Sequence, residues 1–566
     1  MSGVWKVGQI KVKVGGLGMP QVAPSQAQVE RDRADLRAIQ EAAQQRDFDR
    51  ASTLAEAAHK RGLEHPMVLN LLALKLEREE RFDEALAILE RACELAPDDF
   101  AARNALGLCL HRLERYGEAL AQFDRALAAQ PDFAGAHCAR GAALEALGRL
   151  VEAEAAHRRA LELQPENLGA VAGLANLLSR RGAHAEARPL AERVLAAQPN
   201  YPDAVMVLAS ADLADGRTAE ARARLDALIA EPRLTPQQRA LAQGLLGDVL
   251  DAEGRPAEAY EAYAACNMGL WRAYAAAFQE GPGALEFVRE MAEALDFAGP
   301  ETWPRSPAGA APGVKAHVFL LGFPRSGTTL LEQVLASHPE VEALEERETL
   351  ADAMRAFMSA PGDVANLATA GEAELAELRA AYWERVRAEG ADPSGKVFVD
   401  KHPLNTFKLP LIARLFPDAV VLLARRDPRD VVLAAWRRRF AMSGSAYQLL
   451  TLPGTAGYYD AAMRLAERFA PVLGDRLHVV RHESLIADFD RVVGEVCAAV
   501  GLPFTEAMRG FADRTRDRGI ATPTGAQLAG GLSAEGVGSW RRYREQLAPV
   551  LPTLTPWVER FGYEPQ

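Results

Sequence analysis

The chain has 566 residues, which is too long for one hydrophobic core and indicates at least two domains. Hydrophobic residues make up 49% and charged residues 25% of it, a composition that excludes an intrinsically disordered protein. The net charge of −12 argues against general attraction to nucleic acid, so any phosphate site has to be a local basic pocket.

The N-terminal extension, residues 1–28, lacks the run of about 7–15 apolar residues that marks a secretory signal. No other segment approaches the roughly 18 apolar residues that a membrane-spanning helix needs. The five cysteines are scattered and never form a CxxC pair, which argues against a disulfide framework or a zinc site. We therefore expect a cytoplasmic protein without a membrane span or a bound metal.

Prolines recur every 34 residues in the first half of the chain, at Pro97, Pro131, Pro165 and Pro199. Such a period is typical of helical-hairpin repeats. In the unit that begins at Phe100, small residues stand at Gly107, Ala119 and Ala126, where two helices would pack, and Phe123 fills the groove between them. The pattern resembles the tetratricopeptide repeat and predicts an all-α solenoid of six or seven repeats over residues 29–270.

A single hairpin cannot bury its apolar face alone, so stacked repeats form both a core and a concave surface. We expect this surface to bind a protein or peptide partner. The alternative is that the repeats only hold the following domain or a dimer together. Residues 271–313 begin as a helical pattern and end in a run rich in proline and glycine, which predicts a helical connector and a linker.

The second domain, residues 314–566, opens with a strand, a tight loop and a helix. His317–Gly322 has the apolar pattern of a buried strand, and a helical pattern begins at Leu330. Backbone N–H groups in such a loop, together with the positive end of the helix, bind an anion. The candidate ligand-binding residues of the loop are Pro324, Arg325, Ser326, Gly327, Thr328 and Thr329.

The loop imitates the nucleoside-triphosphatase motif G-x-x-x-x-G-K-[ST], but Thr328 stands where the lysine should be. Arg325 instead supplies a guanidinium fork suited to a terminal oxyanion. A triphosphate is therefore not the expected ligand. Phe323–Thr329 resembles the 5′-phosphosulfate loop of sulfotransferases that use 3′-phosphoadenosine-5′-phosphosulfate (PAPS), in the variant of tyrosylprotein sulfotransferases and their repeat-containing bacterial relatives.

The resemblance implies a P-loop-like α/β domain with a mainly parallel central sheet, PAPS as co-substrate without a metal, and a homodimer. It implies that Arg426 and Arg438 hold the 3′-phosphate, although Ala434 replaces a serine that also contacts it. His482 stands where relatives often have a tyrosine against the nucleotide. Ser539 replaces a basic residue before Trp540.

The resemblance also implies catalytic roles. Arg325 holds the transferring group, and Glu346, the seventh residue after a His-Pro pair, removes the acceptor proton. Neighbouring Glu345 is expected to point elsewhere. Lys401 is expected to neutralise the departing oxygen, the alternative being a surface lysine paired with the preceding aspartate. Thr524 is expected to support the sulfuryl oxygens.

We therefore expect a PAPS-dependent sulfotransferase whose acceptor hydroxyl belongs to a protein tyrosine, a glycan or another molecule. Glu348 stands where the family has an arginine for peptide substrates, which puts a tyrosyl peptide in question. Two other functions stay open. One is a P-loop kinase, and the other is a repeat scaffold whose sulfotransferase-like domain is inactive.

Overall fold

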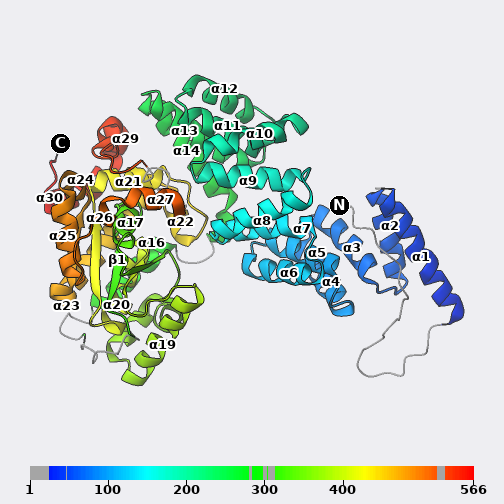
Figure 1. Cartoon of the computed structure of the whole chain (residues 1–566), viewed down its shortest axis with the longest axis horizontal. Coiled ribbons are helices and arrows are strands. Elements are labelled where there is room, and N and C mark those ends of the chain that lie inside the picture. Colours follow the sequence, from blue (N-terminus) through cyan, green and yellow to red (C-terminus); the bar gives the residue numbers. More distant parts are fainter. Residues whose placement is uncertain are drawn as a thin grey trace. The chain divides into compact units, whose positions relative to one another are not determined.

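The computed structural model describes residues 25–45, 47–278, 283–296, 303, 313–518 and 530–565. An all-helical part is followed by an α/β part with a five-stranded sheet (Figure 1). The chain forms two compact units, one of residues up to 178 with 186–199, and the other of residues 179–185 with 200–566. The predicted fold class, a helical repeat solenoid followed by an α/β domain, is confirmed.

Successive helices of the repeat region pack as hairpins, such as α5 with α6 and α13 with α14. A β-carbon on Gly107 would lie 2.5 Å from the Phe123 ring, so the two helices of that hairpin approach as closely as the sequence predicts. The helices of this region are α1 (Gln26–Gln44), α2 (Phe48–Lys60), α3 (Pro66–Arg78), α4 (Phe82–Leu95), α5 (Phe100–Arg112), α6 (Tyr116–Ala129), α7 (Ala134–Ala146), α8 (Leu150–Leu163), α9 (Leu168–Arg180), α10 (His184–Ala197), α11 (Pro202–Ala214), α12 (Thr218–Ile229), α13 (Pro236–Ala252) and α14 (Pro256–Ala273), and the connector that follows contains α15 (Ala275–Phe278) and α16 (Ala284–Asp296).

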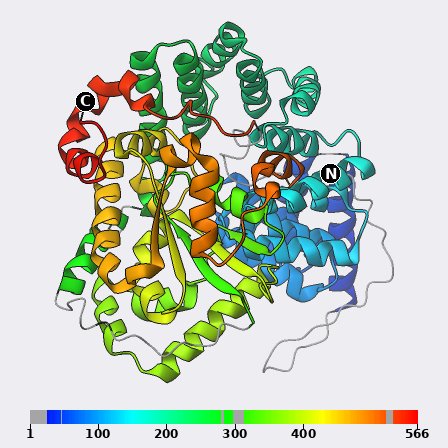
Figure 2. The same ribbon diagram turned by 60° about the vertical axis from the view of Figure 1, so that its left-hand side comes forward.

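The sheet of the second unit is entirely parallel, with strand order β2-β3-β1-β4-β5. Its strands are β1 (Ala316–Leu321), β2 (Val341–Glu345), β3 (Val397–Lys401), β4 (Val420–Arg425) and β5 (Leu477–Arg481). Helices cover both faces of the sheet (Figure 2). Side chains that alternate along one strand therefore enter two different cores. Phe319 of β1 belongs to one core, and its neighbours Val318 and Leu320 belong to the other.

The helical segments around the sheet are α17 (Thr328–Ala336), α18 (Ala351–Phe357), η2 (Pro361–Thr369), α19 (Glu372–Ala388), η3 (Pro403–Lys408), α20 (Leu409–Leu415), α21 (Pro428–Trp436), α22 (Gly444–Gln448), α23 (Leu452–Leu473), η4 (Gly474–Arg476), α24 (His482–Ala487), α25 (Phe489–Ala499), α26 (Glu506–Arg509), α27 (Phe511–Arg518), η5 (Ser539–Tyr543), α29 (Arg544–Leu547), η6 (Ala548–Val550) and α30 (Leu551–Arg560). Across the described ranges, no helix is both long enough and apolar enough to cross a bilayer.

The last hairpin of the repeat region, α13–α14, shares a hydrophobic core with the α/β part. Leu250 and Tyr263 are buried in the same cluster as Phe319 of the sheet. The Asn267 amide donates to the Trp436 carbonyl over 2.9 Å, and the rings of Tyr260 and Trp436 lie 4.8 Å apart. This hairpin is therefore packed on the C-terminal end of α21.

Candidate active site

The predicted phosphate loop joins β1 to α17. A β-carbon on Gly322 would lie 2.4 Å from Ser326 Oγ and 3.0 Å from the Ala424 carbonyl, so the glycine lets the chain pass close to β4 at this point. The Thr406 hydroxyl donates to the Gly322 carbonyl over 2.6 Å and accepts the Gly322 N–H over 3.1 Å. Arg325 and Gly327 have positive φ angles of 73° and 103°, which turn the backbone into the first turn of α17. The loop is thus held from both sides.

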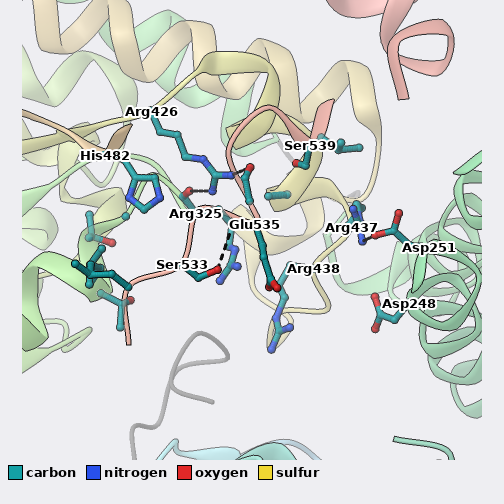
Figure 3. Close-up of a pocket in the computed structure, with 18 of the residues that line it drawn as sticks. Asp248, Asp251, Arg325, Arg426, Arg437, Arg438, His482, Ser533, Glu535 and Ser539 are labelled. Atoms are coloured by element: carbon teal, nitrogen blue, oxygen red, sulfur yellow. Dashed lines mark hydrogen bonds and ion pairs between the residues drawn. The ribbon is translucent and has the colours of Figure 1, made fainter. Parts of the chain in front are cut away.

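A cavity of about 480 Å³ lies beside this loop (Figure 3). Since the sheet is parallel, the carboxyl ends of β1, β4 and β5 meet at one edge, and the segments that follow them all reach the cavity. Seven of the residues predicted from the sequence to bind the donor line it: Arg325, Gly327, Thr328, Thr329, Arg426, Arg438 and His482. Ala434 lines it as well, while Pro324 and Ser326 are buried in the loop itself.

Positive charge is crowded in the cavity. Burial and the nearby guanidinium groups lower the pKa of Arg325 to about 10 and that of Arg438 to about 9. Burial, with Arg426 and Arg325, lowers the pKa of His482 to about 3. Within the described residues, the buried Nε atoms of Arg426 and Arg438 and Nδ1 of His482 have no hydrogen-bond partner. A ligand with several anionic oxygens would satisfy these atoms and relieve the repulsion.

Arg426 also binds the segment around Gly536, which lines the cavity. Its guanidinium donates to the Arg325 carbonyl over 3.3 Å and to the Gly536 carbonyl. Asp430 of α21 holds the same segment, because it accepts the Gly538 N–H at 2.7 Å, the Ser539 hydroxyl at 3.0 Å and the Trp540 N–H at 2.8 Å. Asp430 follows Arg426 by four residues, and the sequence suggested it only as an alternative partner of the arginines, without its role in holding residues 538–540.

A second cluster surrounds Lys401 at the end of β3. Lys401 is fully buried, and its Nζ lies 2.8 Å from Glu346 Oε1 and 3.2 Å from carboxylate oxygens of both Glu332 and Glu345. Burial opposes the ammonium form, but the three carboxylates outweigh it and raise the pKa of Lys401. The expectation that Glu345 points elsewhere is wrong, because β2 ends there and Glu346, with a φ of 49°, turns back toward the same ammonium.

The carboxylates of this cluster have different surroundings. Burial raises the pKa of Glu346, but the charge and hydrogen bond of Lys401 prevail and the pKa is lowered overall. Burial dominates at Glu332, whose pKa is raised to about 8. The structure thus brings Glu346 and Lys401 together, while neither residue lines the arginine-rich cavity.

Asp400, which precedes Lys401 on β3, pairs with other side chains and not with Lys401. Its carboxylate accepts the Thr349 hydroxyl over 2.7 Å and the Tyr382 hydroxyl over 2.9 Å. The first bond ties the loop that follows Glu346 to β3. The alternative of a surface lysine paired with the preceding aspartate is therefore wrong.

Glu348 lies 2.6 Å from the Lys408 ammonium and 3.4 Å from His402 Nε2. The hydrogen bond to His402 and the charge of Lys408 lower the pKa of Glu348 to about 2. Thr524 lies outside the described residues. In the part of the chain that the structure describes, no group of three or more histidine, cysteine or carboxylate side chains is arranged to hold a metal.

The comparisons with known proteins agree with this architecture. Residues 317–506 match the sulfotransferase family, and segments within residues 36–202 and 178–245 match tetratricopeptide repeats. An uncharacterized protein of Aquifex aeolicus is 25% identical over 349 residues, which cover 58% of this chain and 43% of that protein.

Two vertebrate proteins align with shorter parts. Protein-tyrosine sulfotransferase 1 of Danio rerio is 22% identical over 259 residues, covering 44% of this chain and 72% of that protein. Protein-tyrosine sulfotransferase 2 of Gallus gallus is 33% identical over 132 residues, covering 22% of this chain and 35% of that protein. The aligned region thus spans less than half of the Aquifex protein and about a third of the chicken protein. The chain is a tetratricopeptide-repeat protein with a sulfotransferase-family domain.

Proposed function

We propose that this protein transfers a sulfuryl group from PAPS to an acceptor hydroxyl. The observation that carries the proposal is the arginine-lined cavity at the carboxyl ends of β1, β4 and β5, with buried donor atoms that lack partners among the described residues. A bisphosphorylated nucleotide fits such a cavity better than a triphosphate does, because the loop has Thr328 in the lysine position and the second strand ends in arginines.

The residues present fit the co-substrate, which supplies an activated sulfuryl group. The loop N–H groups and Arg325 would hold its 5′-phosphosulfate end. Arg426 and Arg438 would hold the 3′-phosphate, and His482 would lie against the nucleotide. The missing hydroxyl at Ala434 leaves the 3′-phosphate to the two arginines, and we expect weaker binding there but not its loss.

Glu346 is the proposed base that takes the proton from the acceptor hydroxyl. Its lowered pKa keeps it ionised at neutral pH, as a base must be. Lys401 holds Glu346 through its ammonium in this proposal. The family resemblance also assigns it the departing oxygen, and for that role the fully buried ammonium would have to become accessible when the donor binds. Thr524 would assist at the sulfuryl oxygens.

The repeats would recruit the acceptor or a protein partner. The names of the vertebrate relatives point to a protein tyrosine as acceptor, and a glycan hydroxyl is the alternative. Glu348, which contacts Lys408 and His402, stands where the family resemblance expects an arginine for peptides, and its carboxylate favours an acceptor less acidic than a typical sulfated peptide. Cytoplasmic location and a homodimer complete the proposal.

Calorimetric titration with 3′-phosphoadenosine 5′-phosphate (PAP) tests the nucleotide site, with ATP and magnesium as the parallel ligand. We expect PAP to bind the wild type without magnesium and to bind Arg325→Ala far more weakly. Preference for magnesium-ATP would favour a kinase. Absence of binding by both nucleotides would contradict the donor site and favour the inactive scaffold.

Turnover of PAPS to PAP separates an active enzyme from an inactive relative that still binds nucleotide. Glu346→Gln should retain PAP binding and lose turnover by about 100-fold or more, the usual contribution of a positioned base. Equal rates of PAPS turnover in the wild type and in Glu346→Gln would show that Glu346 is not the base.

A further inference from the structure

Three consecutive arginines, Arg437, Arg438 and Arg439, follow the C-terminal end of α21 and line the cavity. The outer two have partners on α13, the penultimate helix of the repeat region. Arg437 Nη2 lies 2.7 Å from Asp251 Oδ2, and Arg439 Nη2 lies 2.5 Å from Asp248 Oδ2. Figure 3 shows Arg437 directed at Asp251, with Arg438 on the side of the cavity where Arg325 and Glu535 lie.

The middle arginine differs from its neighbours. Among the described residues, Arg438 makes no hydrogen bond or ion pair, and its Nε is buried. Its pKa is lowered to about 9, whereas the pKa values of Arg437 and Arg439 are raised, because their acidic and tyrosine neighbours outweigh burial. Only one of the three cations is therefore left to bind an anion.

The two aspartates are themselves fixed. Asp251 accepts the Tyr543 hydroxyl over 2.7 Å and pairs with Arg542 at 2.8 Å. Asp248 accepts the Tyr263 hydroxyl over 2.9 Å. They act as rigid acceptors because the α13–α14 hairpin shares its core with the α/β part.

Gly244 allows the close approach of Arg439 to α13. A β-carbon at Gly244 would lie 2.7 Å from Cδ and 2.9 Å from Nη1 of Arg439. Helix α13 thus supplies two carboxylates that pair with Arg437 and Arg439, and the space at Gly244 that the Arg439 side chain occupies.

We propose that Asp248 and Asp251 are positioning residues for nucleotide binding: they clamp Arg437 and Arg439 on α13 and thereby hold Arg438 toward the 3′-phosphate. The proposal rests on the proposed function, because the role of Arg438 at the 3′-phosphate comes from the family resemblance. It makes the last repeat hairpin a part of the donor site.

The direction in which PAP affinity changes when the aspartates are replaced distinguishes a positioning role from simple electrostatic repulsion. If the aspartates only add negative charge near the cavity, replacing them by asparagine strengthens the binding of an anion. If they hold the arginines in place, the same replacement weakens it. The loss has to concern the 3′-phosphate, so adenosine 5′-phosphate (AMP), which lacks that group, serves as the internal reference.

The experiment measures PAP and AMP affinity by calorimetry on the full chain. Asp248→Asn and Asp251→Asn are each expected to weaken PAP about tenfold, the equivalent of one well-placed charged hydrogen bond, and to change AMP less than about twofold. Gly244→Ala, which displaces Arg439 without changing charge, should act in the same direction. The control Asp226→Asn removes an equal charge from an exposed position on α12 and should change neither affinity.

A double-mutant cycle completes the test, because it is interpretable even where single variants are less stable. In an Arg438→Ala background, Asp251→Asn should have no further effect on PAP. Unchanged or tighter PAP binding by the aspartate variants, or equal loss of PAP and AMP, would overturn the positioning role while leaving the nucleotide site intact. Failure of the wild type to bind PAP would instead refute the proposed function, and the positioning role with it.

Discussion

Replacement of Glu332 by glutamine should stabilise the protein at alkaline pH and leave its stability nearly unchanged in mild acid. Glu332 lies on α17, buried within 3.2 Å of the Lys401 ammonium, with Glu345 and Glu346 as competing carboxylates. Burial raises the pKa of Glu332 to about 8, because the one ammonium that could compensate its charge also contacts Glu345 and Glu346.

The direction follows from proton binding in the two states. An unfolded glutamate ionises at its ordinary value of 4.5, whereas the folded protein keeps Glu332 protonated up to about pH 8. Between these values the folded state binds more protons than the unfolded state, so the free energy of unfolding falls as pH rises. At about 1.4 kcal/mol for each pH unit, and allowing for coupling to Lys401, the wild type loses roughly 2–5 kcal/mol between pH 5 and pH 9. Glutamine mimics the protonated carboxyl and avoids that loss.

Urea unfolding at pH 5.5 and pH 9, followed by tryptophan fluorescence, measures the difference. Of the seven tryptophans only Trp5 precedes residue 271, so the signal reports mainly on the part of the chain that contains Glu332. Glu377→Gln, at an exposed position of α19, is the matched control and should show no pH-dependent gain. An equal loss of stability for Glu332→Gln at both pH values would refute the reasoning, because Glu332 would then be an ionised partner that holds Lys401.

Three further substitutions test other parts of the site. Gly327→Ala puts a β-carbon on a residue with a φ of 103°, 2.7 Å from His482 Nδ1. It should lower the free energy of unfolding by about 1–3 kcal/mol and abolish measurable PAP binding in calorimetry. Wild-type affinity would contradict the close approach. Asp430→Ala leaves the three hydrogen-bond donors of residues 538–540 without their acceptor. Urea unfolding should show a free energy of unfolding lower by about 2–4 kcal/mol. An unchanged free energy would mean that water replaces the carboxylate. Lys401→Met leaves the buried Glu332 carboxylate without its cation and should destabilise by about 3–5 kcal/mol at pH 8 but less at pH 5. A pH-independent loss in thermal scans would argue against that cause.

The features that could be predicted from the sequence are those that depend on neighbouring or regularly spaced residues. A period of 34 residues reveals the repeats because each hairpin has the same packing requirements at Gly107, Phe123 and their counterparts. The strand, loop and helix around Arg325 are likewise contiguous, and parallel strands necessarily deliver the loops after β1, β4 and β5 to one edge. The predicted residues of these loops line a common cavity for that reason.

Local pattern was insufficient where a strand ends. Neighbouring side chains of an extended segment point to opposite faces, and Glu345 was expected to point away from the site for which Glu346 was predicted. The positive φ of Glu346 breaks the alternation directly after the last strand residue, and the Glu346 N–H donates to the Lys401 carbonyl over 2.7 Å. A non-glycine residue in that conformation has no signature in one sequence, so the three-carboxylate cluster could not be derived from it.

The acidic partners of the cavity arginines were unpredictable for a different reason, since they lie 186 and 191 residues earlier in the chain. In the sequence, Arg437–Arg439 is a run of three cations, and only the family resemblance singles out Arg438. Packing α13 against that run neutralises the first and third cations and leaves the second facing the cavity. The positive charge available to a ligand is therefore smaller and more directional than the sequence suggests. A site of this kind favours an anion that meets Arg325, Arg426 and Arg438 at fixed positions over a flexible polyanion that needs only charge.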